Sequence, residues 1–87
     1  MIVAWDEDAW AQYLELQKTD KILLKRINAV ILDIKRNGYK GIGKPEPLTG
    51  NLSGWWSRRL DAKNRIVYRL NEDRLEIIQC GGHYTDK

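Results

Sequence analysis

Hydrophobic side chains recur every three or four residues in the first part of the chain, and this spacing gathers side chains on one face of an α-helix. After Asp6, the residues that keep the spacing are Trp10, Tyr13, Leu14 and Gln17. Asp6 is placed to cap the free amides of a helix start. We predict a first helix that ends near Lys18, preceded by a short apolar strand from Ile2 to Trp5.

A second and stronger helical pattern begins after Thr19 and Asp20. Six apolar residues keep the rhythm for three turns while basic residues occupy the other side: Leu23, Leu24, Ile27, Val30, Ile31 and Ile34. The helix is predicted to end at Asn37 and Gly38, because glycine adopts a left-handed C-terminal cap without a steric penalty.

Three runs of strand character follow, at residues 55–60, 65–70 and 74–80. The connections at 61–64 and 71–73 are short enough to predict consecutive antiparallel hairpins. With the first strand, the order is β-α-α-β-β-β. We therefore predict an α+β domain, with two N-terminal helices on one face of a small, mainly antiparallel sheet.

Alternation along the strands predicts which side chains face the helices. In the middle run the helix-facing residues are Ile66, Tyr68 and Leu70, which leaves Arg65, Val67 and Arg69 on the open face. In the last run the two sides are Leu75, Ile77 and Gln79 against Glu76, Ile78 and Cys80. The neighbours Trp55 and Trp56 point in opposite directions, and the sequence does not decide which is exposed.

The segment from Tyr39 to Ser53 holds three of the seven glycines and both prolines. We predict a long, structured loop here, since long loops in compact domains are usually functional or disordered. Pro45 and Pro47 flank Glu46, and each fixes its own backbone angle and restricts the residue before it. The carboxylate of Glu46 is therefore predicted to sit in a rigid segment.

Composition narrows the class of protein. The chain has 87 residues, of which 43% are hydrophobic and 31% charged, and it has one cysteine and no apolar run of membrane-spanning length. These features predict one domain over residues 1–87, with no disulfide and no membrane span. The N-terminus lacks a secretory signal pattern, so a cytoplasmic location is expected. Cys80 is interpreted as a small buried hydrophobe, and no metal-ligand spacing surrounds it; no cofactor is predicted.

The net charge of +3 is concentrated in residues 41–69, which carry six basic and two acidic side chains. Five of the basic residues fall close together among Trp55, Trp56 and Tyr68; they are Arg58, Arg59, Lys63, Arg65 and Arg69. Arginines interleaved with aromatic residues suit single-stranded nucleic acid, which offers phosphates and flat bases. A solvated sheet face is the alternative interpretation.

Three residues offer the chemistry of a metal-free nuclease. They are Glu46 in the rigid segment, Arg65 on the open face and His83, the only histidine. No phosphate-cradling glycine motif, zinc-protease motif or supported Ser-His-Asp set is present. The residues alone thus permit a carboxylate, an arginine and an imidazole on a basic face.

Several ordered segments resemble the YoeB branch of the RelE-like toxins from bacterial toxin–antitoxin pairs. They are Gly43-Lys-Pro-Glu-Pro-Leu48, Asn51-Leu-Ser-Gly54, Trp56-Ser-Arg-Arg59, Arg65-Ile-Val-Tyr68 and the terminal Cys80 to His83-Tyr84. The resemblance implies a RelE-like fold and a ribosome-dependent endoribonuclease that cuts mRNA in the decoding site of the 70S ribosome and so inhibits translation. It also implies neutralisation by a YefM-like antitoxin, a homodimer and a bacterial cytoplasmic location.

The same resemblance implies a catalytic set of Glu46, Arg65, His83 and Tyr84, with Lys44 and Arg59 as supporting RNA-binding cations. In this interpretation Glu46 is the general base, His83 is the general acid, and Arg65 stabilises the phosphorane. Tyr84 orients the scissile phosphate or the leaving nucleotide. The expected products carry a 2′,3′-cyclic phosphate or 3′-phosphate and a 5′-hydroxyl, and no metal is required.

Three departures from the family pattern are visible. Thr49-Gly50 stands where many relatives carry a basic residue, and Gly81-Gly82 stands where relatives often have arginine and an aromatic residue. Thr85-Asp86-Lys87 follows Tyr84, at which the family tends to stop. The two glycines remove a cation and add backbone freedom before His83, which predicts lower activity or an altered codon preference.

Two other functions share the same residues. A non-catalytic module could bind RNA or an acidic antitoxin with the basic face, and a small ribosome-independent ribonuclease could also pair glutamate with histidine. Dependence of a new mRNA 3′ end on Glu46 separates cutting from binding, and cleavage of naked RNA separates the two enzymes. A DNA-binding repressor is disfavoured, because neither helix shows a basic recognition face after a tight turn.

Overall fold

The computed structural model describes residues 1–82, and its elements follow the predicted order with two additions. The helices are α1 (Glu7–Thr19) and α2 (Lys21–Asn37). The longer strands are β1 (Ile2–Trp5), β3 (Trp56–Arg59), β4 (Arg65–Asn71) and β5 (Arg74–Cys80). The additions are strand β2 (Glu46–Pro47) and the 3-10 turn η1 (Gly50–Leu52), both inside the segment predicted to be a loop.

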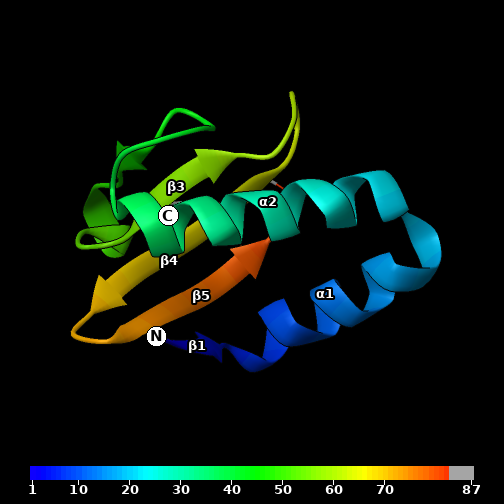
Figure 1. Cartoon of the computed structure of the whole chain (residues 1–87), viewed down its shortest axis with the longest axis horizontal. Helices are drawn as coiled ribbons and strands as arrows, with labels where there is room; N and C mark the ends of the chain where they lie inside the picture. Colours follow the sequence, from blue (N-terminus) through cyan, green and yellow to red (C-terminus); the bar gives the residue numbers. More distant parts are fainter. Residues whose placement is uncertain (83–87) are drawn as a thin grey trace.

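The strands form one sheet in the order β1-β5-β4-β3-β2 (Figure 1). β1 runs parallel to β5, while the pairings β5–β4, β4–β3 and β3–β2 are antiparallel. The helices α1 and α2 pack on this sheet, and α2 crosses the strands in Figure 1. The predicted α+β class with a mainly antiparallel sheet is therefore confirmed.

The residues predicted to begin and end the helices do so in the structure. The Asp6 carboxylate accepts a hydrogen bond from Asp8 N at the start of α1, and the Asp20 carboxylate accepts one from Leu23 N at the start of α2 (each 3.0 Å). Gly38 ends α2 with a φ of 66°, a conformation that glycine adopts without a Cβ clash. Neither helix in the described part of the chain is long and apolar enough to cross a membrane.

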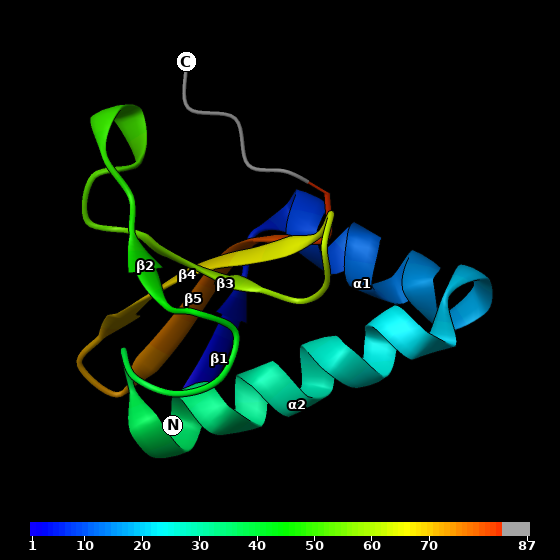
Figure 2. The same ribbon diagram turned by 90° about the horizontal axis from the view of Figure 1, so that it is seen from above.

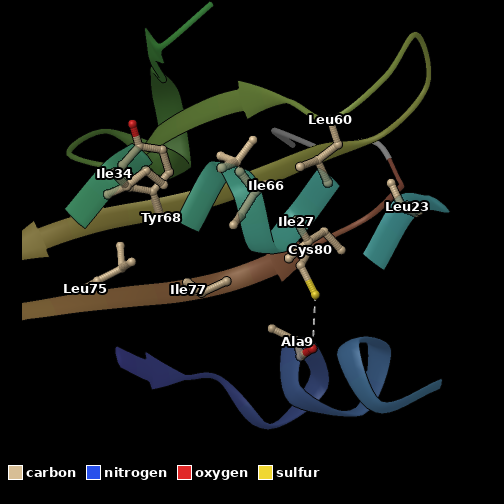
Figure 3. Close-up of a cluster of buried hydrophobic side chains, with 11 residues drawn as sticks. Ala9, Leu23, Ile27, Ile34, Leu60, Ile66, Tyr68, Leu75, Ile77 and Cys80 are labelled. Atoms are coloured by element: carbon tan, nitrogen blue, oxygen red, sulfur yellow. Dashed lines mark hydrogen bonds between the residues drawn. The ribbon is translucent and has the colours of Figure 1, made fainter. Parts of the chain in front are cut away.

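The core lies between the helices and one face of the sheet (Figure 3). From α2 it takes Leu23, Ile27, Val30 and Ile34, and from β4 and β5 it takes Ile66, Tyr68, Leu75, Ile77 and Cys80. Burying these apolar side chains contributes roughly 1.5–3 kcal/mol each. The helix-facing residues predicted for the middle strand are confirmed at Ile66 and Tyr68, which are fully buried, and at Leu70, which packs against the core.

The prediction of strict alternation along β5 is wrong at its end. A register shift between Val67 and Tyr68 of β4 pairs Val67 with Gln79 but Tyr68 with Ile77, so one residue of β5 is skipped. Cys80 therefore joins Ile77 on the helix side, and Gln79 lies on the other side. The Cys80 thiol donates a hydrogen bond to Ala9 O (3.3 Å; Figure 3), which confirms Cys80 as a buried core residue.

Candidate active site

Glu46 lies on the face of the sheet turned away from the helices. Its strand β2 pairs with β3 so that Glu46 is opposite Ser57, and Ser57 is in turn opposite Val67 of β4. Directly paired residues share a face, so Glu46 lies on the face away from the helices with Ser57 and Val67, whereas Trp56 and Tyr68 belong to the core. The expectation that this face is open along its whole length is wrong at Ser57 and Val67, which are buried, while Glu46 is exposed. We keep the name open face for this side of the sheet. Figure 2 shows β2 and η1 (green) at the edge of the sheet beyond β3.

Arg59 and Arg65 form the next cross-strand pair on the same open face. Adjacent strands are about 4.8 Å apart and two residues along a strand span about 6.6 Å. From the register, the Cα atoms of Glu46 and Arg59 are therefore roughly 8 Å apart, and those of Glu46 and Arg65 roughly 12 Å. Side chains of this length can reach one small group from both sides, so the register brings the predicted carboxylate and arginine to one site.

Arg65 is joined to the end of β5 by two backbone hydrogen bonds. Gly81 N donates to Arg65 O (2.8 Å), and Arg65 N donates to Gly82 O (3.0 Å). One guanidinium nitrogen, Arg65 Nη1, is buried and has no hydrogen-bond partner within residues 1–82. A buried donor without a partner raises the free energy of the fold, and an anionic oxygen is the acceptor that guanidinium groups bind most strongly.

The predicted residues His83 and Tyr84 lie outside the described residues. The residue before them, Gly82, is held on both sides: its N donates to Asn64 Oδ1 (2.6 Å) and its O accepts from Arg65 N. Asn64 is fixed in turn by Asp61, whose carboxylate accepts hydrogen bonds from its side-chain amide. These bonds lower the pKa of Asp61, with the Asn64 side chain as the largest cause.

Lys44 is exposed and lies two residues before Glu46 in the same segment. Its φ is 50°, a left-handed value that is uncommon for residues with a side chain and is further disfavoured before a proline. Such backbone strain costs on the order of 1 kcal/mol or more and is found mainly at functional segments.

The basic cluster predicted from the sequence is divided by the fold. Arg69 is on the open face, but it pairs with Glu76 and its guanidinium stacks 4.4 Å from the ring centroid of Trp55. Trp55 is thus the tryptophan on the open face, while Trp56 packs against the core and stacks on Tyr39 at 4.5 Å between ring centroids. The charge of Arg69 is compensated locally, so the basic surface is narrower than the sequence indicated.

Arg58 corrects the predicted cluster more strongly, because its side chain is on the core side and is fully buried. Its guanidinium pairs with Asp33 of α2 and its Nε donates to Tyr68 Oη (3.1 Å). The hydrogen bond from Arg58 is the largest cause that lowers the pKa of Asp33 below its usual 3.8. The sequence analysis missed this pair. One signal was available: Arg58 lies two residues from both Trp56 and Leu60, so alternation puts it on the same face as these two core residues.

The basic residues that the register and the sequence bring near Glu46 are Lys44, Arg59 and Arg65. None of the three forms an ion pair with another residue of 1–82. Such a set can bind a phosphate and stabilise added negative charge on it, next to a carboxylate that can accept a proton. Within residues 1–82 there is no group of three or more His, Cys, Asp or Glu side chains placed to hold a metal ion.

Comparison with known proteins finds similarity over almost the whole chain. A family model described as "YoeB-like toxin of bacterial type II toxin-antitoxin system" matches residues 5–84. Toxin YoeB of Synechocystis sp. is 51% identical over 84 residues, which cover 97% of this chain and 98% of the relative. Toxin YoeB of Escherichia coli K12 is 48% identical over 84 residues, which cover 97% of this chain and 100% of the relative.

Solved structures give the same result. The YoeB/ParE toxin from Agrobacterium tumefaciens superimposes with a TM-score of 0.92 at 44% identity, covering 97% of this chain and 100% of that one. The YoeB chain of a YoeB-YefM complex from Staphylococcus aureus gives a TM-score of 0.90 at 36% identity, with 97% and 98% coverage. On these matches, the chain belongs to the YoeB-like toxins of bacterial type II toxin–antitoxin systems.

Proposed function

We propose that this chain is a ribosome-dependent endoribonuclease that inhibits translation by cutting mRNA in the decoding site. The observation that carries the proposal is the register of β2, β3 and β4, which puts Glu46, Arg59 and Arg65 on one open face. Family membership supports a toxin, and the residues of this face fit the chemistry of RNA cleavage.

In the proposed reaction, Glu46 accepts the proton of a ribose 2′-hydroxyl, and the 2′-oxygen attacks the adjacent phosphorus. Arg65 stabilises the charge that builds on the phosphorane oxygens, and its buried Nη1 supports this role because it lacks a partner among the described residues. His83, as an imidazolium, gives a proton to the departing 5′-oxygen. Tyr84 orients the scissile phosphate or leaving nucleotide. The products are a 2′,3′-cyclic phosphate, or the 3′-phosphate formed by its hydrolysis, and a 5′-hydroxyl.

Lys44 and Arg59 hold the backbone of the RNA in this proposal. Both are exposed near Glu46, one in the same loop and one on the next strand. The ribosome supplies the step that the isolated protein lacks, since the decoding site splays the bases and places the 2′-hydroxyl in line with its phosphate.

The proposed protein partners are a YefM-like antitoxin and a second copy of this chain. The complex and the dimer known for the S. aureus relative support both. Trp10 and Leu14, one turn apart on α1, are each 44% exposed, and Trp10 packs against Trp5 and Tyr13. Exposed apolar residues grouped in this way are typical of a surface that another protein covers. We also propose that the protein is located in the bacterial cytoplasm.

The experiment that tests the proposal maps new mRNA 3′ ends on programmed ribosomes, comparing the parent with Glu46→Gln. We expect the cut to slow by about 10²- to 10⁴-fold, the usual contribution of a positioned acid or base. The matched control is Glu72→Gln, because Glu72 is exposed in the turn at the opposite end of β4. Cleavage by Glu46→Gln at the parental rate would contradict the assignment of the base. Rapid cleavage of naked RNA by the parent would contradict ribosome dependence.

A further inference from the structure

The guanidinium of Arg58 is fully buried, and all five of its N–H donors are used. An arginine side chain has five such donors in a fixed, planar arrangement. Arg58 Nε donates to Tyr68 Oη, and the two terminal nitrogens donate to the Asp33 carboxylate and to three backbone oxygens. Those oxygens are Ile42 O (3.0 Å), Gly38 O (2.8 Å) and Lys40 O (2.7 Å).

The three carbonyl groups belong to alternate residues of the segment that joins α2 to β2. This segment is therefore wrapped around the guanidinium, and Asp33 closes the arrangement from α2 because its Oδ2 also accepts from Ile42 N (3.1 Å). We call Arg58, Asp33 and the carbonyl groups of residues 38, 40 and 42 the Arg58 clamp. Removing the guanidinium would take the shared donor from all five acceptors at once.

The clamped segment leads directly to Glu46. Immediately after the clamp, Gly43 O accepts from Arg59 N at 2.6 Å, and Glu46 then pairs with Ser57. The residues on both sides of Arg58 in β3 therefore bind the segment through their backbone, while Arg58 itself holds the segment from the core side. β2 is only two residues long and Glu46 is exposed, so the strand alone provides few contacts that fix the carboxylate.

Space in the clamp is too small for side chains on its glycines. A Cβ added to Gly41 would meet Asp33 Oδ2 at 1.9 Å, and one added to Gly43 would meet Arg59 O at 2.7 Å. Both glycines also have positive φ values, 127° and 81°. The segment therefore approaches Asp33 and β3 more closely than any residue with a side chain allows.

We propose that Arg58 is a positioning residue for Glu46, which it holds in register with Arg65 by fixing the segment from Gly38 to Gly43. The inference rests on the proposed role of Glu46 as general base. A shift of about 1 Å in a catalytic group can cost on the order of 10²-fold in rate, so a group on so short a strand depends on what holds its loop. Lysine cannot replace Arg58, because its ammonium has three donors for five acceptors.

The test is a set of double-mutant cycles. Asp33→Asn, Gly41→Ala and Arg58→Lys are each made in the parent and in Glu46→Gln, and single-turnover cleavage is measured on programmed ribosomes at saturating protein. We expect each clamp variant to lower the parental rate by about 10- to 100-fold, with ribosome affinity retained. In the Glu46→Gln background, the same changes should alter the residual rate by less than about threefold, because the residue on which the clamp acts is already lost.

Loss of stability is controlled with Asp20→Ala, which removes the cap at the opposite end of the same helix. This variant should lower the melting temperature and leave the cleavage rate within about twofold of the parent. If Arg58→Lys does not fold, Asp33→Asn and Gly41→Ala still act on the same segment. Parental cleavage by Asp33→Asn, or equal losses in both backgrounds, would overturn the inference. A parental rate for Glu46→Gln alone would overturn the proposed base instead.

Discussion

Arg59 lies directly across from Arg65 in the antiparallel pairing of β3 and β4, so the exposed Arg59 and the half-buried Arg65 share the face away from the helices. Like charges in this position repel, so the pair lowers the stability of the hairpin unless an anion binds between them. The arrangement is typical of a binding site, in which a local cost to the fold is offset when the ligand arrives.

Arg59→Gln should raise the free energy of unfolding by about 0.2–1 kcal/mol at low salt, because it removes the cross-strand repulsion. The same variant should bind RNA less tightly. Thermal denaturation at several salt concentrations measures the first effect, and the gain should shrink as salt increases. A loss of stability at low salt would show that the two guanidinium groups do not repel each other appreciably.

Lys44 should contribute to RNA binding through charge alone. If it contacts one phosphate, Lys44→Gln weakens binding for all sequences and reduces the slope of log K against log salt by about 1. Titration of the inactive Glu46→Gln protein with a single-stranded RNA measures the slope without cleavage. The control is Lys25→Gln. Lys25 is exposed on α2, which packs on the face of the sheet opposite to that of Glu46. An unchanged slope would remove Lys44 from the interface.

The acid side of the stability curve should depend on Asp33 and Asp61. Both have a pKa below the usual 3.8, the first mainly through the hydrogen bond from Arg58 and the second mainly through Asn64. Each carboxylate therefore stabilises the fold above pH 3.8, and this contribution is lost as the pH falls through the lowered pKa. Urea denaturation between pH 6 and pH 2 should show a flatter acid limb for Asp33→Asn than for the parent. Parallel acid limbs would contradict the ion pair.

The single cysteine should be unreactive in the folded protein. Burial raises the pKa of Cys80 to about 11, so the thiol stays protonated at neutral pH, and only the thiolate reacts rapidly. Labelling with a thiol reagent should be slow in buffer and fast in denaturing urea. Fast labelling of the native protein would place Cys80 outside the core.

Much of the fold could be predicted from the sequence, because its signals are local. Asp6, Asp20 and Gly38 mark the helix ends, and the apolar spacing of α2 gives the face that packs on the sheet. Two features were missed for physical reasons. The strand β2 has only two residues, Glu46 and Pro47, and is too short to show alternation. The register shift between β4 and β5 near Gln79 cannot be seen in the pattern of polar and apolar residues.

The part of the candidate site that lies on strands, or between the two prolines, could be predicted from the sequence. Alternation placed Arg65 on the open face, and the prolines on either side of Glu46 indicated a rigid carboxylate. Arg58 was grouped with the exposed arginines because charge suggests solvent. Arg58 is buried because it pairs with Asp33, twenty-five positions away, and with three backbone carbonyl groups. The alternation of polar and apolar residues along a strand gives no information about such partners. The roles of His83 and Tyr84 remain predictions from the family resemblance.

Replacing one 2′-hydroxyl in the mRNA tests the proposed cleavage reaction. Two messages that differ only by a 2′-deoxy nucleotide at the mapped cleavage position are placed on ribosomes and exposed to the parent protein. We expect a cut with a 2′,3′-cyclic or 3′-phosphate end in the all-ribose message and no cut at that position in the deoxy message, because the attacking oxygen is missing. Cleavage of both messages at the same position would contradict the proposed reaction.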